Sequence, residues 1–172
     1  MCSTATLPYF RSGLGAVRLT EAGKAFARQR NWLVTQSEWE HLDESHAGEI
    51  YLQHTALILA FAREARYRGY QVVLTPTLDS VPTRMQPDVL LKGQTDRLYV
   101  EVERSREPKT EKWDNLDKLQ GFVAVCVQSR ARRKRLAARL RSLNLPGQAT
   151  DLETLSQCRA GGEPGPLWLE HW

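Results

Sequence analysis

The segment PDVLLKGQTDRLYVEVERS, residues 87–105, constrains the fold of this chain more than any other part of the sequence. Two runs rich in strand-forming residues flank a GQTD turn, which predicts two adjacent strands. Asp88 opens the first strand, while Glu101 and Glu103 share one face of the second because side chains alternate along a strand. We therefore expect three carboxylates to converge at one edge of a sheet.

The segments before this hairpin predict a helix and a strand. EIYLQHTALILAFAREARYRGY places Leu57 and Phe61 at helical spacing, and Gly69 supplies a C-terminal stop. The next segment, QVVLTPTL, has the β-branched residues of a strand. A helix followed by three strands is the expected first half of the core.

The segments after the hairpin complete an α/β pattern. KWDNLDKLQGF predicts a helix, and FVAVCVQS is a continuous apolar run of the kind found in strands buried on both faces. RARRKRLAARLRSL predicts a basic amphipathic helix with its leucines inside, and QATDLETLSQ predicts a short strand and helix. We therefore predict a mixed β-sheet with helices on both sides.

The N-terminal region predicts a smaller part of the chain. AVRLTEAGKAFARQR, residues 16–30, has the pattern of a short strand followed by a helix with Thr20 as its N-cap. The polar sequence SEWEHLDESH then predicts a loop or short helix that links this lead-in to the core. We therefore divide the chain into residues 1–46 and residues 47–172.

Composition and cysteine spacing exclude several classes of protein. No apolar run approaches the roughly 20 residues that a membrane span needs, and the N-terminus lacks the pattern of a secretory signal, so we expect a cytoplasmic protein. Cys2, Cys126 and Cys158 are far apart and form no zinc-ligand pattern. Cys126 lies inside an apolar run and is expected to be a buried small hydrophobic residue.

Positive charge is concentrated in one short stretch of the chain. The formal net charge is +4, and seven basic residues without a compensating acid fall within residues 130–141. They are Arg130, Arg132, Arg133, Lys134, Arg135, Arg139 and Arg141. Such a cluster attracts phosphates through counterion release, which favours a DNA partner, although an exposed basic helix also serves solubility alone. Arg104 and Arg106, just past Glu103, are further candidates for phosphate contact.

The three carboxylates predict a site for a divalent cation. Neighbouring acids in a half-buried sheet repel each other and are costly to desolvate unless a cation neutralises them. Oxygen ligands suit Mg²⁺ or Mn²⁺, which polarise phosphodiesters and activate water. Asp88, Glu101 and Glu103 are the expected ligands. Glu49, near the start of the upstream helix, is a further candidate ligand, or it complements the helix dipole.

This arrangement resembles the PD-(D/E)XK nuclease superfamily, whose motif is a Pro-Asp followed on the neighbouring strand by an acid, any residue and a lysine. Asp88 matches the first acid and Glu101 the second, and the resemblance implies a restriction-endonuclease-like fold. Glu103 stands where the superfamily has its lysine. Members can move that lysine to the following helix, and Lys118 is our candidate for the substitute. Its alternative role is an exposed ion pair with Asp114.

A wider resemblance, to the replication-relaxation family, covers most of the chain. It depends on the V-x-LT-x-x-G phrase of a winged-helix ending, a helix with His54, the PD strand, YVEVERS, the following KL and basic helices, and a closing GPLW segment. The resemblance implies a partial winged-helix-like lead-in before a nuclease-like domain. It also implies an association with plasmid or mobile-element replication and conjugative relaxation. Glu103 fits this family, which usually has an aspartate there.

These observations lead to three candidate functions. The first is metal-dependent DNA cleavage or nicking, with Asp88, Glu101, Glu103 and Lys118 as catalytic residues. The second is a catalytically degenerate DNA-binding accessory factor for replication or conjugative relaxation. The third is a subunit that binds a replication, relaxase, transposition or defence protein. His54 is expected to be a satisfied core histidine, and a role beside the metal site is the alternative.

Overall fold

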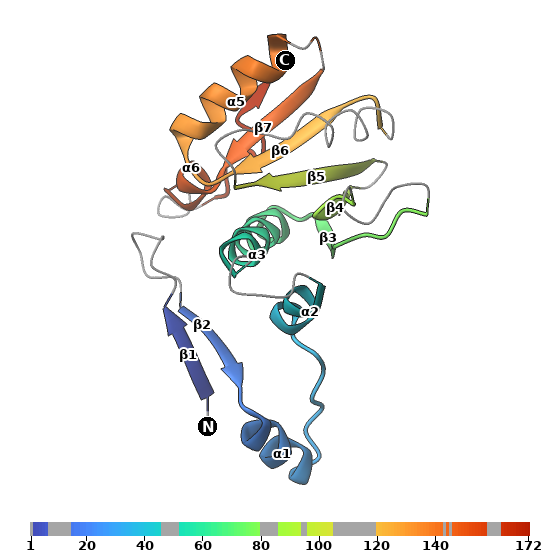
Figure 1. Ribbon diagram of the computed structural model, residues 1–172, viewed down its shortest axis with the longest axis vertical. Coiled ribbons are helices and arrows are strands. Elements are labelled where there is room, and N and C mark those ends of the chain that lie inside the picture. Colours follow the sequence, from blue (N-terminus) through green and yellow to red (C-terminus); the bar gives the residue numbers. More distant parts are fainter. Residues whose placement is uncertain are drawn as a thin grey trace. The chain divides into compact units, whose positions relative to one another are not determined.

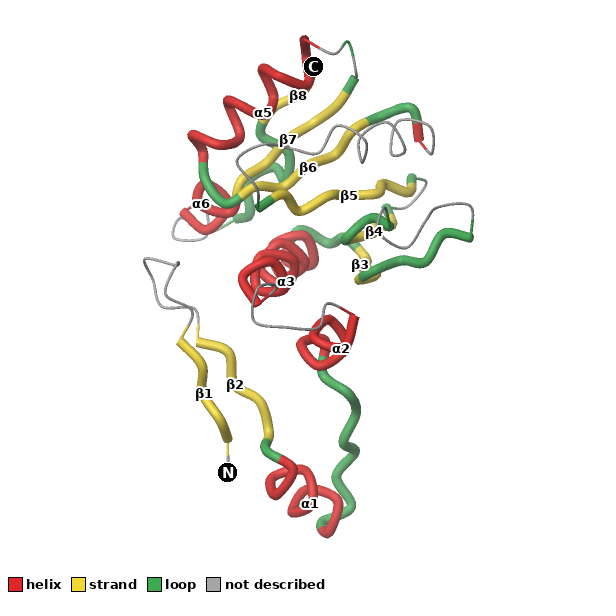
Figure 2. The backbone as a smooth tube through the Cα atoms, viewed as in Figure 1, coloured by secondary structure: helices red, strands yellow, loops and turns green. Residues whose placement is uncertain are grey.

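The structure is a computed structural model, and it describes residues 2–6, 15–45, 52–79, 86–93, 96–104, 120–142, 144, 146–157 and 163–172. The chain divides into two compact units, Met1–Gln53 and His54–Trp172. Each unit is described below by itself. Figure 1 labels the helices and strands in chain order, and Figure 2 colours them by type.

The first unit begins with a two-stranded antiparallel hairpin. Strand β1 (Cys2–Thr6) pairs with β2 (Gly15–Leu19), and helix α1 (Glu21–Gln29) follows directly. The hydroxyl of Thr20 accepts a hydrogen bond from the amide of Gly23 at 3.2 Å, which confirms the expected N-cap. Strand β1 was not expected from the sequence.

A capping box begins the second helix of this unit, α2 (Glu38–Ser45). The amide of Glu40 donates to the hydroxyl of Ser37 at 3.2 Å, and the amide of Ser37 donates to the carboxylate of Glu40 at 2.9 Å. The same carboxylate accepts a hydrogen bond from the ammonium group of Lys24 in α1. One side chain therefore both caps α2 and ties it to α1.

This arrangement predicts an unusually acidic carboxyl group. The hydrogen bond from Lys24 and those from Ser37 lower the pKa of Glu40 from its usual 4.5 to about 2. Because the pKa is depressed in the folded state, the stabilisation is complete above pH 4.5 and is lost as the pH falls towards 2. An NMR titration of the Glu40 carboxyl carbon should show this midpoint. The Lys24→Gln variant should move it upward, and a wild-type midpoint near 4.5 would contradict the ion pair.

The second unit contains a six-stranded mixed sheet in the order β3-β4-β5-β6-β7-β8. The strands are β3 (Gln71–Leu74), β4 (Val89–Lys92), β5 (Arg97–Glu103), β6 (Val123–Val127), β7 (Gly147–Asp151) and β8 (Glu170–His171). Neighbours from β3 to β5 are antiparallel, those from β5 to β7 are parallel, and β8 is antiparallel to β7. The predicted α/β class with a mixed sheet is confirmed.

Helices flank this sheet (Figures 1 and 2). They are α3 (Leu52–Tyr67), α5 (Arg130–Ser142) and the short α6 (Leu152–Gln157). Helix α3 buries Leu57 and Phe61, as the helical spacing predicted, and Gly69 follows it with a φ of 85°. Glycine adopts this left-handed conformation without the strain that a Cβ atom brings, so it ends the helix.

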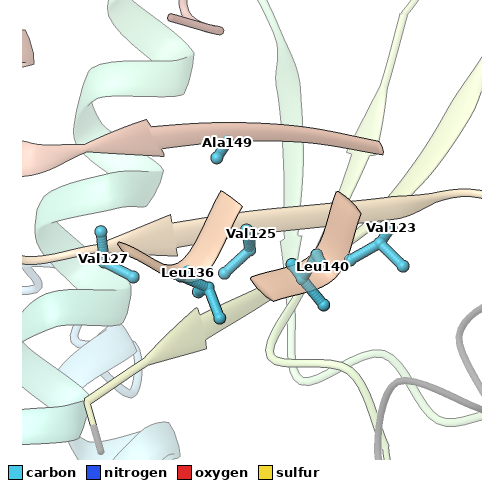
Figure 3. Packing of buried hydrophobic residues seen from close by; sticks show 6 residues of the cluster. All are labelled: Val123, Val125, Val127, Leu136, Leu140 and Ala149. Carbon is cyan, nitrogen blue, oxygen red and sulfur yellow. The ribbon is translucent and has the colours of Figure 1, made fainter. Parts of the chain in front are cut away.

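Strand β6 lies at the centre of the hydrophobic core. Its alternate residues Val123, Val125 and Val127 pack with Leu136 and Leu140 of α5 and with Ala149 of β7 (Figure 3). Ala124 and Cys126 point to the opposite face and are also fully buried, so the predicted strand buried on both faces is confirmed. Burial raises the pKa of the Cys126 thiol well above its usual value, and the charge of Asp151 raises it further. Cys126 is therefore a neutral packing residue.

The short strand β8 is the last strand of the sheet, and the residue after it, Trp172, contacts Gly147 of β7. The amide of Gly147 donates a hydrogen bond to the carbonyl oxygen of Trp172. The amide of Trp172 donates in return to the carbonyl oxygen of Gly147, and both bonds are 3.0 Å long. A Cβ atom on Gly147 would lie 2.6 Å from the backbone oxygen of Val123 and 2.7 Å from the Trp172 ring. Only glycine fits this position without a shift of the backbone.

The Gly147→Ala variant is therefore expected to lower the free energy of unfolding by about 1–3 kcal/mol, the usual range for overpacking. Gly93→Ala is the matched control because its added Cβ atom would make only an ordinary contact, 3.6 Å from the Asp96 carbonyl. Urea unfolding of both variants beside the wild type measures the difference. Equal midpoints for the two glycine variants would show that β7 and β8 are not this closely packed.

Candidate functional site

Asp88 lies immediately before β4, is 4% exposed, and is held at three points. Its carbonyl oxygen accepts a hydrogen bond from the amide of Thr75 at 2.9 Å. Its carboxylate lies 3.0 Å from Nε2 of His54 in α3 and accepts a bond from the amide of Val102 in β5 at 2.8 Å. Asp88 therefore bridges a helix and the neighbouring strand.

The sequence explains why the Asp88 side chain bonds to the backbone of β5. The ladder between β4 and β5 begins with Val89 opposite Val100, and Pro87 precedes Asp88. The amide of Val102 therefore lies just past the last ladder pair, and burial requires it to find an acceptor. The carboxylate of Asp88 provides that acceptor. The Pro-Asp pair at the start of β4 therefore places the Asp88 carboxylate in a hydrogen bond with the backbone of β5.

Two glutamine side chains, which the sequence analysis did not assign to the site, hold the surrounding backbone. The amide group of Gln86 bonds to the backbone nitrogen and oxygen of Leu78 at 2.7 and 2.9 Å. Gln120 bonds in the same way to the nitrogen and oxygen of Tyr99 at 2.9 and 3.1 Å. These contacts fix the chain that enters Asp88 and the strand that carries Glu101.

Glu101 and Glu103 lie on the same face of β5, as alternation predicted. Glu101 pairs in register with Val125 and Glu103 with Val127, the β6 residues that pack against α5. Glu101 is 2% exposed, whereas Glu103 is half-buried. Continuing the β4–β5 register by one residue sets Asp88 opposite Glu101. By this register, the buried Asp88 just before β4 and the buried Glu101 in β5 occupy adjacent positions.

The expected convergence of three carboxylates is only partly seen. Within the described ranges, no group of three or more His, Cys, Asp or Glu side chains is arranged to hold a metal ion. The carboxylate of Asp88 bonds to the backbone of β5 and to His54. Glu49 and Lys118, the other predicted ligand and catalytic residue, fall outside the described residues.

The chemistry of Asp88 and Glu101 nevertheless suits a hard divalent cation. A carboxylate has about four acceptor positions, so one carboxylate oxygen can accept a hydrogen bond and bind a metal at the same time. Mg²⁺ keeps several water ligands and commonly takes only one or two carboxylates from a protein. Asp88 and Glu101 therefore fit as two protein ligands of such an ion.

His54 is a satisfied histidine that also contacts the candidate site. Nε2 of His54 lies 3.0 Å from the Asp88 carboxylate, and an ionised carboxylate only accepts hydrogen bonds, so Nε2 is the donor when Asp88 is ionised. The imidazole orients the carboxylate in the way that partners orient metal ligands in many proteins. The sequence suggested either a hydrogen-bonded core histidine or a place beside the candidate metal site, and the position of His54 is compatible with both.

The basic helix α5 begins beside the end of β5. The guanidinium group of Arg132 donates to the carbonyl oxygen of Arg104 at 2.9 Å, and Arg104 itself is exposed. Arg130, Lys134 and Arg135 are exposed on α5. These predicted phosphate contacts therefore remain accessible, whereas Arg106 falls outside the described residues.

Arg133 is the exception among the predicted DNA-binding residues. It is 6% exposed, forms an ion pair with the fully buried Asp151, and has its Nε 3.8 Å from Glu170. Helical geometry explains the difference, because Arg133 shares the inner face of α5 with Leu136 and Leu140. Arg133 is therefore a structural residue, and we withdraw it from the candidate DNA surface.

Comparisons with family models, with curated proteins and with solved structures each find no match to this chain. None of the helices in the described part of the chain has both the length and the apolar character that crossing a membrane requires.

Proposed function

We propose that this chain is a DNA-acting protein with a restriction-endonuclease-like domain, in which Asp88 and Glu101 hold Mg²⁺ or Mn²⁺ for phosphodiester cleavage. The observation that carries the proposal is the buried carboxylate of Asp88, which bonds to the β5 backbone at Val102, one residue from the buried Glu101. The exposed basic residues that begin α5, next to the end of β5, support a phosphate-rich partner. The proposed context is a plasmid or mobile-element system.

Each residue has a distinct part in this proposal. Asp88 and Glu101 bind the cation, and His54 keeps the Asp88 carboxylate in its orientation. A bound cation of this kind polarises the phosphoryl oxygen and activates water. Glu103, half-buried at the end of the same strand, orients that water through its carboxylate. Arg104 is exposed and contacts the phosphate backbone.

The proposal is tested by incubating the protein with supercoiled and linear plasmid in Mg²⁺ or Mn²⁺. Asp88→Asn and Glu101→Gln keep the size of each side chain but remove its charge, so both are expected to lose cleavage. Glu163→Gln, an exposed acid of the same unit, is the matched control and should cleave like the wild type. Cleavage that persists in both site variants would exclude this pair as the metal site.

His54 provides an independent prediction about the same site. Loss of a partner that orients a metal ligand typically lowers metal affinity or activity by about 10–100-fold. His54→Ala is therefore expected to reduce cleavage by that factor and to raise the Mg²⁺ concentration for half-maximal activity. His54→Gln, which retains a donor, should recover part of the loss. A Mg²⁺ requirement unchanged in His54→Ala would assign His54 to packing alone.

A second candidate is a DNA-binding accessory factor without cleavage activity. It is favoured by Glu103, which occupies the position of the superfamily lysine and cannot supply a positive charge to the reacting phosphate. In that case the wild type retards DNA in a gel without cutting it. Asp88→Asn then binds DNA as well as the wild type, or more tightly because one negative charge is removed.

A further inference from the structure

The exposed face of α5 carries its positive charge in two rows. Arg132 and Arg141 donate to backbone carbonyl oxygens. Of the other basic residues of α5 that are exposed, Arg130 and Lys134 are four residues apart and form one row, and Arg135 and Arg139 form the other. At 3.6 residues per turn, the rows lie roughly 140° apart around the helix axis. All four side chains are exposed. A flat contact with a single line of phosphates would leave one of the two rows unused.

The residues between the two rows have short side chains. Ala131 and Ala138 are two turns apart on the exposed face, and both are exposed. The helix carries no acid, and in the part of the chain that the structure describes no ion pair involves the four row side chains. The outer face of α5 is therefore a narrow neutral ridge with positive charge on both sides, and the carboxylate of Glu153 accepts a hydrogen bond from the amide of Arg130 at 3.2 Å.

Helix α5 is held firmly on its inner face and near both ends. Leu136 and Leu140 pack into the core (Figure 3), and Arg132 bonds to the backbone of Arg104. At the other end, the guanidinium of Arg141 donates to the carbonyl of His171 at 3.4 Å and lies 5.6 Å from the centre of the Trp172 ring. The two rows are therefore presented by a fixed helix, which limits the entropy lost on binding.

We infer that α5 enters the major groove of a B-form DNA duplex, with one basic row on each of the two phosphate backbones. An α-helix with its side chains is about 10–12 Å across, and the major groove is about 12 Å wide. The alanine ridge allows the helix to approach the groove floor and offers no hydrogen bonds to base edges. Binding through α5 is therefore independent of DNA sequence. This inference rests on the proposed DNA-acting function and names the form of DNA.

Salt dependence of duplex binding tests the two rows separately. Each phosphate contact contributes about 0.9 to the slope of log affinity against log salt, so Arg130→Gln/Lys134→Gln and Arg135→Gln/Arg139→Gln should each lower the slope by about 2. Arg28→Gln/Arg97→Gln removes the same charge from two exposed positions outside α5 and is the matched control. Anisotropy of a labelled duplex measures the slopes. A change confined to one row would overturn the two-backbone arrangement.

Two experiments test whether α5 enters the major groove. The first places larger uncharged side chains on the alanine ridge, and the second compares DNA with RNA duplexes. Ala131→Gln/Ala138→Gln keeps the charge and the helix propensity, and should weaken duplex DNA binding by roughly tenfold at an unchanged salt slope. Double-stranded RNA of the same sequence should bind the wild type more weakly, because its major groove is deep and narrow. Unchanged binding by the alanine variant, or equal affinity for RNA and DNA duplexes, would overturn the inference.

The two proposals fail in different ways. If the α5 variants bind DNA like the wild type while Asp88→Asn still loses cleavage, groove binding by α5 is wrong and the proposed function stands. If the wild type neither cleaves nor retards any DNA, both are wrong. Circular dichroism of each α5 variant confirms that the helix is intact before binding is compared.

Discussion

Replacing Asp151 with alanine is expected to lower the free energy of unfolding by about 3–5 kcal/mol, the usual effect of breaking a buried ion pair from one side. Asp151 is fully buried at the end of β7 and pairs with the guanidinium of Arg133. It also accepts bonds from the amide and hydroxyl of Thr154 at 2.7 and 3.1 Å, at the start of α6. Its loss leaves Arg133 buried, and among the described residues Glu170, 3.8 Å from the Arg133 Nε, is the acid that remains near it.

The double variant Arg133→Met/Asp151→Leu separates the ion pair from general packing. Removing both charges leaves no uncompensated charge inside the protein, so the double variant should be more stable than Asp151→Ala. Guanidinium chloride unfolding of the wild type, Arg133→Met, Asp151→Leu and the double variant gives the coupling between the two residues. A loss below about 1 kcal/mol in Asp151→Ala would mean that water reaches this pair in solution.

Mg²⁺ is expected to stabilise the wild-type protein in the absence of DNA. An ion that binds only the folded state adds about 2.7 kcal/mol to the unfolding free energy at a hundredfold excess over its Kd. The physical source is neutralisation of the adjacent buried carboxylates Asp88 and Glu101. Thermal unfolding with Mg²⁺, and again after chelation with EDTA, measures the shift. Glu101→Gln should remove it because the variant lacks one of the two anionic ligands.

The outcomes of this titration also bear on the choice between cleavage and simple DNA binding. An equal Mg²⁺ shift in the wild type and in Glu101→Gln would locate the ion elsewhere on the molecule. No shift in the wild type would show that Asp88 and Glu101 bind no ion, which favours the accessory factor. Glu163→Gln again serves as the control, because removal of an exposed acid should leave the Mg²⁺ shift intact.

Local sequence patterns were sufficient for most elements of the second unit. The alternation in residues 87–105 gave β4 and β5 and the common face of Glu101 and Glu103, and the apolar run at residues 123–127 gave a strand buried on both faces. The helical spacing of Leu57 and Phe61 gave α3 and its buried side. These signals are readable because a helix or strand repeats with a fixed period, so burial of one face marks the sequence directly.

The two-residue strand β8 is too short to show such a period. It forms because Gly147 and Trp172 exchange backbone hydrogen bonds, although the two residues are far apart in the sequence. Arg133 shows the same limit within a helix. Its neighbours in sequence suggested a phosphate contact, whereas its place on the inner face of α5 buries it against Asp151.

The sequence by itself determined the α/β class, the main helices and strands, and which strands carry the candidate acids. Only the tertiary structure decided which polar groups meet. His54 and Asp88 are 34 residues apart and bond to each other, while Asp88 also takes the place of a missing backbone acceptor for Val102. The physical reason is that periodic burial depends on neighbours along the chain. A hydrogen bond or an ion pair depends instead on positions and directions that only the packing of distant segments sets.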